Sequence, residues 1–596
     1  MMMRQSMRRN AIKIQGERSS SFSLARGRLM LISSCFVLAY IIMALRAFDL
    51  AVIQGDLTRL GVSDVSLVEM DEVPKASTVS VARRGDIIDR NGVLLATTLE
   101  TSSLYADPRY IAEPDVAAKR LSEVFTALSY GDVLQKLQSD RRFVWIKRGI
   151  LPREEQAILE IGEPGLKIEK ESRRIYPHGQ MFAHLLGYTN VDNKGQGGVE
   201  RGFDNILTDG RPLSLTLDVR LQHILRREVS SAIEEYSALG GVGVIMDVHS
   251  GEILAGVSMP DFDPHKVGKA APQELFNRLT LGVYEFGSVF KIFSTAALFE
   301  VLNVPMETTF DASEPIKRGR FTINDYHAEN RILSVPEVFM HSSNIGSAMM
   351  GEAVGTQALR NFYSDLGLLT PLNFEVREVG KPMVPEPWGE IHTLTASYGH
   401  GVATTAVQLT SAVSTIVNGG YAVKPTLVMN AQKKKEAPID RLTRIALQNA
   451  QKGQPKAQAD VRVLSKDASD KMRSLLRLVV TDGTGKKANV KGFAVGGKTG
   501  TAEKPGVKGY DRKRLISSFM GVFPMDAPRY AIFVAVDEPK GTKASYGYAT
   551  GGWVAAPAVA NIVRSMASVL GLKPDVQSTD MAAPLRQLIS MEGAHE

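Results

Sequence analysis

The sequence predicts an α+β protein with a single N-terminal transmembrane helix, an elongated β-rich domain and a larger domain of helices around an antiparallel sheet. Three observations support this organisation. One uncharged apolar run stands near the N-terminus, short β-rich runs follow it, and strands alternate with helical stretches from residue 240 onward. With 596 residues and 44% hydrophobic side chains, the chain can form two cores and a membrane segment.

Residues 1–28 form a basic tail. They hold seven Lys and Arg side chains against Glu17, which accounts for nearly all of the net charge of +7. The rest of the chain is close to neutral, so no nucleic-acid-binding surface is expected. Residues 29–48 begin LMLISSCFVLAYIIMAL and are apolar enough for one transmembrane helix. The positive-inside rule puts the tail in the cytoplasm and everything after about residue 50 outside.

Two other interpretations of the apolar run are disfavoured. A cleaved signal peptide would show a small-x-small site after the run, and no Ala-x-Ala stands there. A lipoprotein box would end at Cys35, yet the run continues for ten residues beyond it. Cys35 is the only cysteine of the sequence, so the exported part is expected to have no disulfide.

Residues 49–239 are expected to form a scaffold, called here the pedestal, because no catalytic constellation stands out in them. Near its start, residues 83–96 read RRGDIIDRNGVLLA, two alternating strands around Asn91-Gly92. Such a turn favours a β-hairpin. Its charges are best interpreted as a salt-bridged structural turn.

Residues 240–572 are expected to form the second domain. It opens with a buried strand at 241–247, a turn, and a returning strand at 252–257. A polar stretch near 431–460 is typical of an exposed insertion. Residues 573–596 lack a sustained apolar pattern, so we expect a flexible tail.

The first chemical motif is Ser288-x-x-Lys291. Gly287 precedes Ser288, and a helix that is apolar on nearly all sides follows. Ser288 in the first helical turn would have its alkoxide stabilised by the helix dipole, and Lys291 would fall on the same face. Lys291 can accept the proton only if burial and a second cation lower its pKa. Alone, the pattern is more often a simple helix start.

The second motif is Ser342-Ser343-Asn344, before a run suited to a helix. The Ser342 hydroxyl and the Asn344 amide could relay the leaving-group proton and hold Lys291 and the substrate. In isolation this pattern would most simply be a helix cap.

The third motif is Lys498-Thr499-Gly500-Thr501, in a strand rich in small residues. An edge strand here could pair with a peptide substrate. Lys498 would attract a carboxylate, and Thr499 and Thr501 would offer hydroxyl donors. The backbone N–H groups of Thr501 and Ser288 would form an oxyanion hole.

Residues 492–499 also match the phosphate-binding loop pattern G-x-x-x-x-G-K-[ST]. Such a loop follows a buried strand and opens a helix, whereas a polar stretch precedes this one and Pro505-Gly506 soon follows it. A nucleotide site is therefore disfavoured.

The chain resembles class B penicillin-binding proteins, and within that class the division-specific transpeptidases, over nearly all of residues 29–570. Besides the three motifs, the likeness rests on residues 84–96, 171–177 (ESRRIYP), 183–192 (AHLLGYTNVD), 198–201 (GVER), 397–401 (SYGHG) and 551–557 (GGWVAAP). Phe286 stands where that family usually has proline, and His400 where an aromatic residue is common.

The resemblance implies a D,D-transpeptidase that cross-links peptidoglycan stem peptides at the division septum. Ser288 attacks the penultimate D-alanine carbonyl, terminal D-alanine leaves, and an amine of a neighbouring stem peptide resolves the acyl-enzyme. β-Lactams would acylate Ser288. His400 would lie near the cleft, where substrate contact and a packing role both stay open. No metal or organic cofactor is implied. A bacterial inner-membrane location, a separate glycosyltransferase of the FtsW type and other divisome proteins are implied.

Three alternatives stay open. An elongation-type transpeptidase of the same class would show the same motifs. A β-lactamase or carboxypeptidase would not need the pedestal or the membrane anchor, and no Glu-x-x-Leu-Asn deacylation motif is present. A catalytically minor divisome scaffold that binds β-lactams would act mainly through the pedestal.

Overall fold

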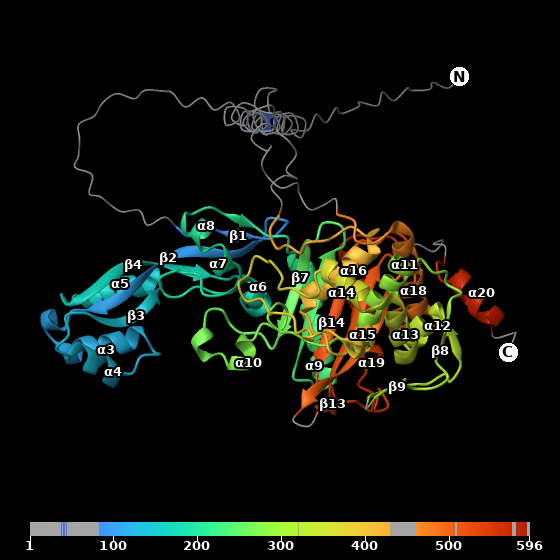
Figure 1. Ribbon diagram of the computed structural model, residues 1–596. Coiled ribbons are helices and arrows are strands. Elements are labelled where there is room, and N and C mark those ends of the chain that lie inside the picture. Colours follow the sequence, from blue (N-terminus) through green and yellow to red (C-terminus); the bar gives the residue numbers. More distant parts are fainter. Residues whose placement is uncertain are drawn as a thin grey trace, which may run out of the picture. The chain divides into compact units, whose positions relative to one another are not determined.

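The computed structural model describes residues 83–319, 321–429, 461–506, 509–574 and 580–592, together with Val37, Tyr40, Ile41 and Met43 (Figure 1). The expected tail at 1–28, most of the expected span at 29–48 and the expected insertion at 431–460 lie outside the described residues. Among the helices that are described, none is both long and apolar enough to cross a membrane. Everything from residue 83 onward belongs to one structural unit, Val81–Glu596.

The pedestal is built on a five-stranded sheet in the order β3-β2-β1-β5, with β4 also paired to β2. Its strands are β1 (Ile87–Ile88), β2 (Leu94–Ala106), β3 (Val144–Ile150), β4 (Leu166–Ile175) and β5 (Leu213–Ser214). Its helices are α3 (Pro114–Val124), α4 (Tyr130–Leu137), α5 (Pro152–Ile161), α6 (Ala183–Leu186), α7 (Gly198–Gly202) and α8 (Asp204–Thr208). Helices α3, α4 and α5 pack beside β2 and β3 around a core of their own (Figure 1).

The predicted hairpin at residues 83–96 is confirmed, because β1 pairs with β2 in antiparallel register around a turn with Gly92 at φ +85°. The charges near it are structural. Glu200 is fully buried and lies 2.7 Å from both the Arg84 and the Arg174 guanidinium. Arg84 also pairs with Asp204 at 2.7 Å. A buried carboxylate is tolerated only when it is paired in this way, so the network ties the segment before β1 to β4 and α7.

The second part holds a five-stranded antiparallel sheet in the order β12-β13-β14-β6-β7, which leaves β12 as an edge. The strands are β6 (Gly240–Asp247), β7 (Ile253–Met259), β12 (Gly496–Gly506), β13 (Gly509–Phe523) and β14 (Tyr530–Asp537), with short strands β8 (Thr309–Asp311), β9 (Ile316–Arg318), β10 (Phe321–Ile323) and β11 (Ile332–Ser334).

The helices of this part cover both faces of the sheet. They are α9 (Val219–Glu235), α10 (Pro272–Leu275), α11 (Lys291–Leu302), α12 (Val335–His341), α13 (Asn344–Val354), α14 (Thr356–Asp365), α15 (Glu390–Ser397), α16 (Ala406–Val417), α18 (Lys466–Thr481), α19 (Gly551–Val569) and α20 (Ala583–Glu592).

Strand β6 shows how its sequence serves two cores. Val242, Val244 and Met246 face the core that contains α11, α16 and α18, whereas Ile245 faces the core of α9 and α19. This alternation follows from the two-residue period of a strand. A Cβ on Gly243 would lie 2.8 Å from the Leu225 side chain, so the glycine lets α9 pack closely on the sheet.

Two expectations differ from the structure. Helix α9 lies inside the range expected for the pedestal, yet its side chains pack on β6, β7 and α19, so it belongs with the second part. The tail after residue 572 also contains α20, whose Leu585 is buried and whose Arg586 lies 2.9 Å from Asp482. A short apolar stripe and this ion pair hold a helix that the sequence pattern suggested would be flexible.

Candidate active site

The nucleophile candidate Ser288 lies in a 3-10 turn, Gly287–Phe290, that leads into α11. The sequence predicted the first turn of an α-helix, and the tighter turn places Lys291 as the first residue of α11. Nearly all of α11 is buried, as its apolar composition predicted. Gly287 has φ +53°, a conformation in which a residue with a Cβ would be strained. Within the described ranges the Ser288 hydroxyl has no hydrogen-bond partner.

The Ser342-Ser343-Asn344 motif spans the junction of two helices. Ser342 ends α12 in the left-handed conformation, with φ +62°. Ser343 caps α13 by accepting a hydrogen bond from Gly346 N at 2.9 Å. The motif is therefore a cap, as its isolated pattern suggested, and the sharp turn also points Ser342 and Asn344 toward Lys291.

The third motif lies on β12, where the sequence predicted a strand, and β12 is an edge of its sheet. Close contacts press this strand against the nucleophile turn. A Cβ on Gly500 would lie 2.4 Å from Phe286 O, and a Cβ on Gly287 would lie 2.5 Å from Thr501 O. Both positions must therefore be glycine for β12 to approach Ser288 so closely.

Two buried lysines meet at Ser342. Lys291 Nζ lies 3.1 Å from Ser342 Oγ and 2.8 Å from Asn344 Oδ1, and it donates to Ser342 O. Lys498 Nζ lies 2.9 Å from the same Ser342 Oγ. The structure thus brings together four of the predicted catalytic residues, and a hydroxyl that contacts two amines can pass a proton between them.

The electrostatics of this group favour a neutral base. Both lysine side chains are fully buried. Burial lowers the pKa of Lys498 to about 7. Burial, reinforced by the positive charge of Lys498, lowers the pKa of Lys291 well below its ordinary value, while Asp325 acts in the opposite direction. These are the two conditions, burial and a second cation, that proton acceptance by Lys291 requires.

Asp325 is a residue that sequence reasoning missed. Its carboxylate accepts hydrogen bonds from Ser343 Oγ at 2.7 Å, from Ile345 N at 3.0 Å and from Asn344 N. It therefore holds the start of α13, including Asn344, in place. Asp325 stands in a polar loop with no motif around it, so only its contacts reveal this role.

The predicted substrate-binding residues line the same strand and its neighbours. The Thr501 hydroxyl accepts from Gly551 N at 3.1 Å, which leaves its own hydrogen available to a ligand. Thr499 Oγ1 lies 2.8 Å from Thr484 Oγ1. His400 lies in a loop that touches the nucleophile turn, since a Cβ on Gly399 would lie 1.9 Å from Gly287 O.

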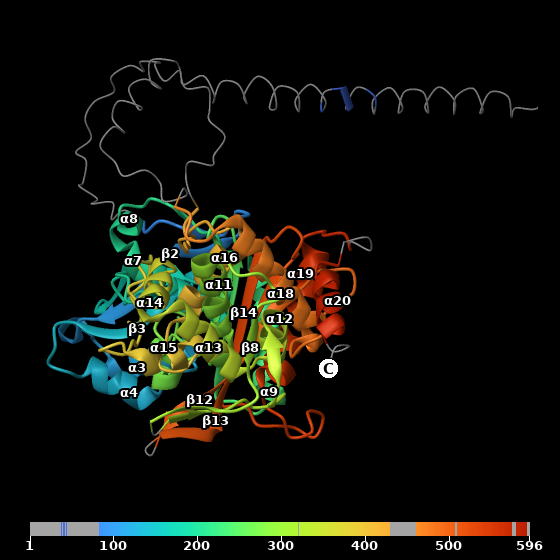
Figure 2. The same cartoon turned by 45° about the vertical axis from the view of Figure 1, so that its right-hand side comes forward.

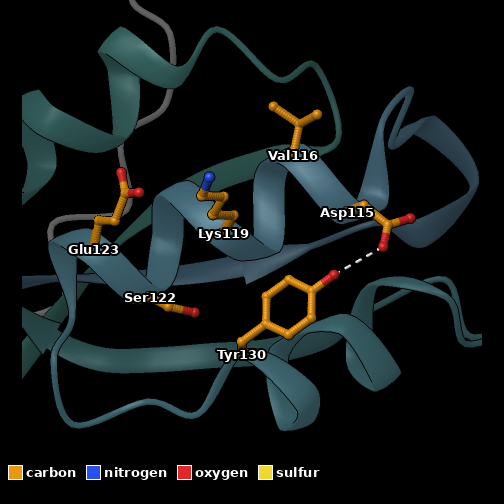
Figure 3. Close-up of a pocket in the computed structure, with 6 residues that line it drawn as sticks. All are labelled: Asp115, Val116, Lys119, Ser122, Glu123 and Tyr130. Carbon is orange, nitrogen blue, oxygen red and sulfur yellow. Dashed lines mark hydrogen bonds between the residues drawn. The ribbon is translucent and has the colours of Figure 1, made fainter.

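A pocket on the pedestal lacks the lysine and serine arrangement of this site (Figure 3). Its lining residues are Asp115, Val116, Lys119, Ser122, Glu123 and Tyr130. The Tyr130 hydroxyl donates to Asp115 at 2.8 Å, and the Ser122 hydroxyl donates to Ala118 O of its own helix at 2.7 Å. The serine is thus engaged in α3. In the described part of the chain, no group of His, Cys, Asp and Glu side chains is arranged to hold a metal ion.

Family models match most of the chain. The Penicillin binding protein transpeptidase domain matches residues 241–564, and the Penicillin-binding Protein dimerisation domain matches residues 79–209. The three motifs all fall within the first of these matches.

Curated relatives and solved structures agree with these matches. A probable peptidoglycan D,D-transpeptidase FtsI of Caulobacter vibrioides is 38% identical, over 84% of this chain and 83% of the relative. The FtsI of Escherichia coli K12 is 28% identical, over 89% of this chain and 88% of the relative. Penicillin binding protein 3 of Mycobacterium tuberculosis, solved with aztreonam, gives a TM-score of 0.63 at 23% identity, over 84% and 99% of the two chains. This last likeness shows a shared fold.

Proposed function

Because this chain belongs to the penicillin-binding protein transpeptidase family, we propose that Ser288 is its acylated nucleophile and that Lys291, Ser342 and Lys498 move the protons. The chain is a class B penicillin-binding protein, a serine-type peptidoglycan D,D-transpeptidase of the FtsI type and a target of β-lactams. The site geometry supports the roles proposed here for its individual residues.

In the first step the Ser288 oxygen attacks the carbonyl carbon of the penultimate D-alanine, and its proton passes to the neutral Lys291 amine. The three contacts of Lys291 fill the positions around Nζ, so one must be released as the proton arrives. The Ser342 hydroxyl, at 3.1 Å, is the most distant of these partners. The backbone N–H groups of Ser288 and Thr501 would stabilise the oxyanion.

In the second step the tetrahedral intermediate breaks its C–N bond and releases D-alanine. The leaving amine takes a proton from the Ser342 hydroxyl, which is replenished from Lys291 or Lys498. An amine of a second stem peptide then attacks the ester, loses a proton along the same path and returns Ser288 to its starting state. Lys498, Thr499 and Thr501 would hold the substrate carboxylate beside β12.

One observation carries this assignment: the single Ser342 hydroxyl lies within hydrogen-bond distance of both buried lysines. A structural cap needs neither lysine, and two buried cations at one oxygen raise the energy of the fold. Proton transfer through Ser342 would explain why both lysines are buried beside this hydroxyl.

The test is covalent labelling with a fluorescent penicillin, comparing wild type with Ser288→Ala and locating the adduct by mass spectrometry. We expect label on Ser288 that is lost in the variant. A folded wild-type protein that takes no label, or one labelled on another residue, would refute the assignment.

The proposal extends to location and partners. The basic tail at 1–28 and the apolar run at 29–48 support a single-pass protein of the bacterial inner membrane, with the catalytic part in the periplasm. The FtsI relatives support work at the division site beside an FtsW-type glycosyltransferase and other divisome proteins. A fluorescent fusion tests this: septal signal is expected, whereas signal along the lateral wall would favour the elongation role.

A further inference from the structure

Three segments beside the nucleophile meet at one carboxylate, that of Glu285. Glu285 stands three residues before Ser288, and its side chain is 17% exposed. Its Oε1 accepts hydrogen bonds from Gly401 N at 2.8 Å and from the Tyr510 hydroxyl at 3.0 Å. Its Oε2 faces His400 Nδ1 at 3.6 Å. One side chain therefore joins the nucleophile turn, the loop at 398–401 and the outer end of β13.

Aromatic packing reinforces this junction. The His400 ring meets the Tyr510 ring edge-on at a centroid distance of 5.1 Å, and the Tyr398 ring in the same way at 5.3 Å. Such contacts add to the effect of burial and fix the orientation of the rings. The loop and the strand end are thus held to each other as well as to Glu285.

The outer end of the β12–β13 hairpin needs such support. β14 pairs with β13 only over residues 516–523, whereas β12 pairs with β13 down to Gly509. The hairpin therefore extends beyond the other strands, as Figure 2 shows at the lower edge of the view. A ribbon of two strands is marginally stable by itself. Lys504 is held by Asp537 at 2.8 Å, but Tyr510 lies farther out.

We infer that Glu285 is a positioning residue for acyl transfer, which holds the hairpin end and the 398–401 loop against the Ser288 turn. The inference rests on the proposed function, because it concerns how β12 presents a substrate to Ser288. Strand β12 carries Lys498 and Thr501, so movement of the hairpin would change the distance between these residues and the nucleophile. A misplacement of about 1 Å can slow an enzyme about 100-fold.

The two carboxylate oxygens differ, and this decides which substitution should matter. Oε1 accepts both hydrogen bonds, whereas Oε2 is buried without a hydrogen bond. Burial raises the pKa of Glu285 and lowers the pKa of His400, with the positive charge of Lys291 acting in the same direction on His400. A proton taken up by Glu285 would bind to Oε2 beside His400. The two hydrogen bonds that Oε1 accepts, called here the Glu285 tie, therefore do not require the negative charge. Glutamine should keep the tie, and alanine should lose it.

The experiment measures the rate constant for labelling of Ser288 by fluorescent penicillin in the full-length membrane protein, together with the thermal midpoint. The variants are Glu285→Ala, Glu285→Gln, Tyr510→Phe and the double variant Glu285→Ala with Tyr510→Phe. Arg512→Gln is the matched control, because Arg512 lies on the same strand with its side chain 91% exposed.

We expect Glu285→Ala to label about tenfold more slowly or worse, and Glu285→Gln to recover most of the rate. Tyr510→Phe should be slower than wild type, and the double variant should be no slower than Glu285→Ala, because both changes break one tie. Arg512→Gln should label like wild type.

Two results would overturn the inference: Glu285→Ala labelling at the wild-type rate, or Glu285→Ala and Tyr510→Phe effects that multiply. If Glu285→Ala does not fold, Tyr510→Phe becomes the deciding variant. A folded Tyr510→Phe protein that is labelled at the wild-type rate would contradict the inference. These outcomes differ from a failure of the proposed function, in which the wild-type protein itself would take no label on Ser288.

Discussion

Lys291 and Lys498 come from distant parts of the chain, yet their Nζ atoms lie 3.1 Å and 2.9 Å from the same oxygen, Ser342 Oγ. Both amines are fully buried, which lowers the pKa of each, and the charge of Lys498 lowers the pKa of Lys291 further. We propose that a proton moves between them through Ser342, and most of the expected behaviour of the site follows from this.

Removing the shared hydroxyl should slow acylation without unfolding the protein. We expect Ser342→Ala to lower the rate constant for penicillin labelling about 100-fold, the size of a typical general acid-base contribution. Ser347→Ala is the matched control, because this buried hydroxyl donates to Ser343 O at 2.7 Å and contacts neither lysine. Labelling of Ser342→Ala at the control's rate would contradict the relay.

The pH dependence of kcat/KM should be bell-shaped. The rate should rise as Lys291 loses its proton, at a pH well below the ordinary lysine range because its pKa is lowered. It should fall around pH 7 as Lys498, whose pKa is about 7, loses the charge that attracts the substrate carboxylate. The two limbs are macroscopic properties of the coupled pair.

A substrate whose carboxylate is replaced by an amide separates the two limbs. The falling limb should disappear with this substrate, because its binding no longer needs the Lys498 charge. An unchanged falling limb would show that Lys498 does not act through the carboxylate.

Replacing Lys498 should abolish activity and raise the free energy of unfolding. Its pKa is about 7 in the fold and about 10.4 in an unfolded chain, so between these values the unfolded state binds more protons and stability rises with pH. Lys498→Met should abolish labelling yet raise the free energy of unfolding at pH 7 by on the order of 1–3 kcal/mol. The thermal midpoints of wild type and Lys498→Met, measured from neutral to alkaline pH, should converge as the pH rises. A Lys498→Met variant that is less stable than wild type at pH 7 would contradict the cost of burying this charge.

Neutralising Asp325 should move the acid limb of the pH profile. Its negative charge raises the pKa of Lys291, so Asp325→Asn should shift that limb to lower pH while the amide keeps most of the cap of α13. Asp325→Ala should in addition lose stability of about 1 kcal/mol through the lost cap. An acid limb that stays in place in Asp325→Asn would show that Lys291 is not the group observed.

The buried carboxylate of the pedestal should be essential to its stability. Glu200→Gln leaves Arg174 without a compensating charge and leaves Arg84 with Asp204 alone, so we expect a loss of about 3–5 kcal/mol. Asp209→Asn is the control, since its pair with Arg211 is more than 60% exposed on both sides and should contribute less than about 1 kcal/mol. Thermal unfolding measures both, and similar midpoints would contradict the network.

Much of this architecture could be predicted from local patterns. The hairpin at 83–96, the β6–β7 pair and the strand β12 all appear as predicted. Helix α9 lies in the range expected for the pedestal but packs on the sheet of the second part, because an amphipathic stripe indicates that a helix is buried but not against which partner. Helix α20 was missed because its few apolar residues become buried only against α12 and α18.

The supporting residues of the site were the least predictable. Asp325 and Glu285 lie in segments without a repeating pattern, and each acts through backbone N–H groups and hydroxyls that belong to other segments. Nothing in the local sequence distinguishes such a carboxylate from one on a solvated surface.

The sequence alone determined the groups and their local spacing: a serine with a lysine three residues on, a serine and asparagine at a helix junction, and a lysine in a glycine-rich strand. These relations depend on helix and strand geometry, which short patterns encode. Tertiary structure decided that the two lysines share one hydroxyl, that burial lowers the pKa of both, and that Glu285 joins three segments. Those properties depend on burial and on distances between elements far apart in the chain, which only the packed core sets.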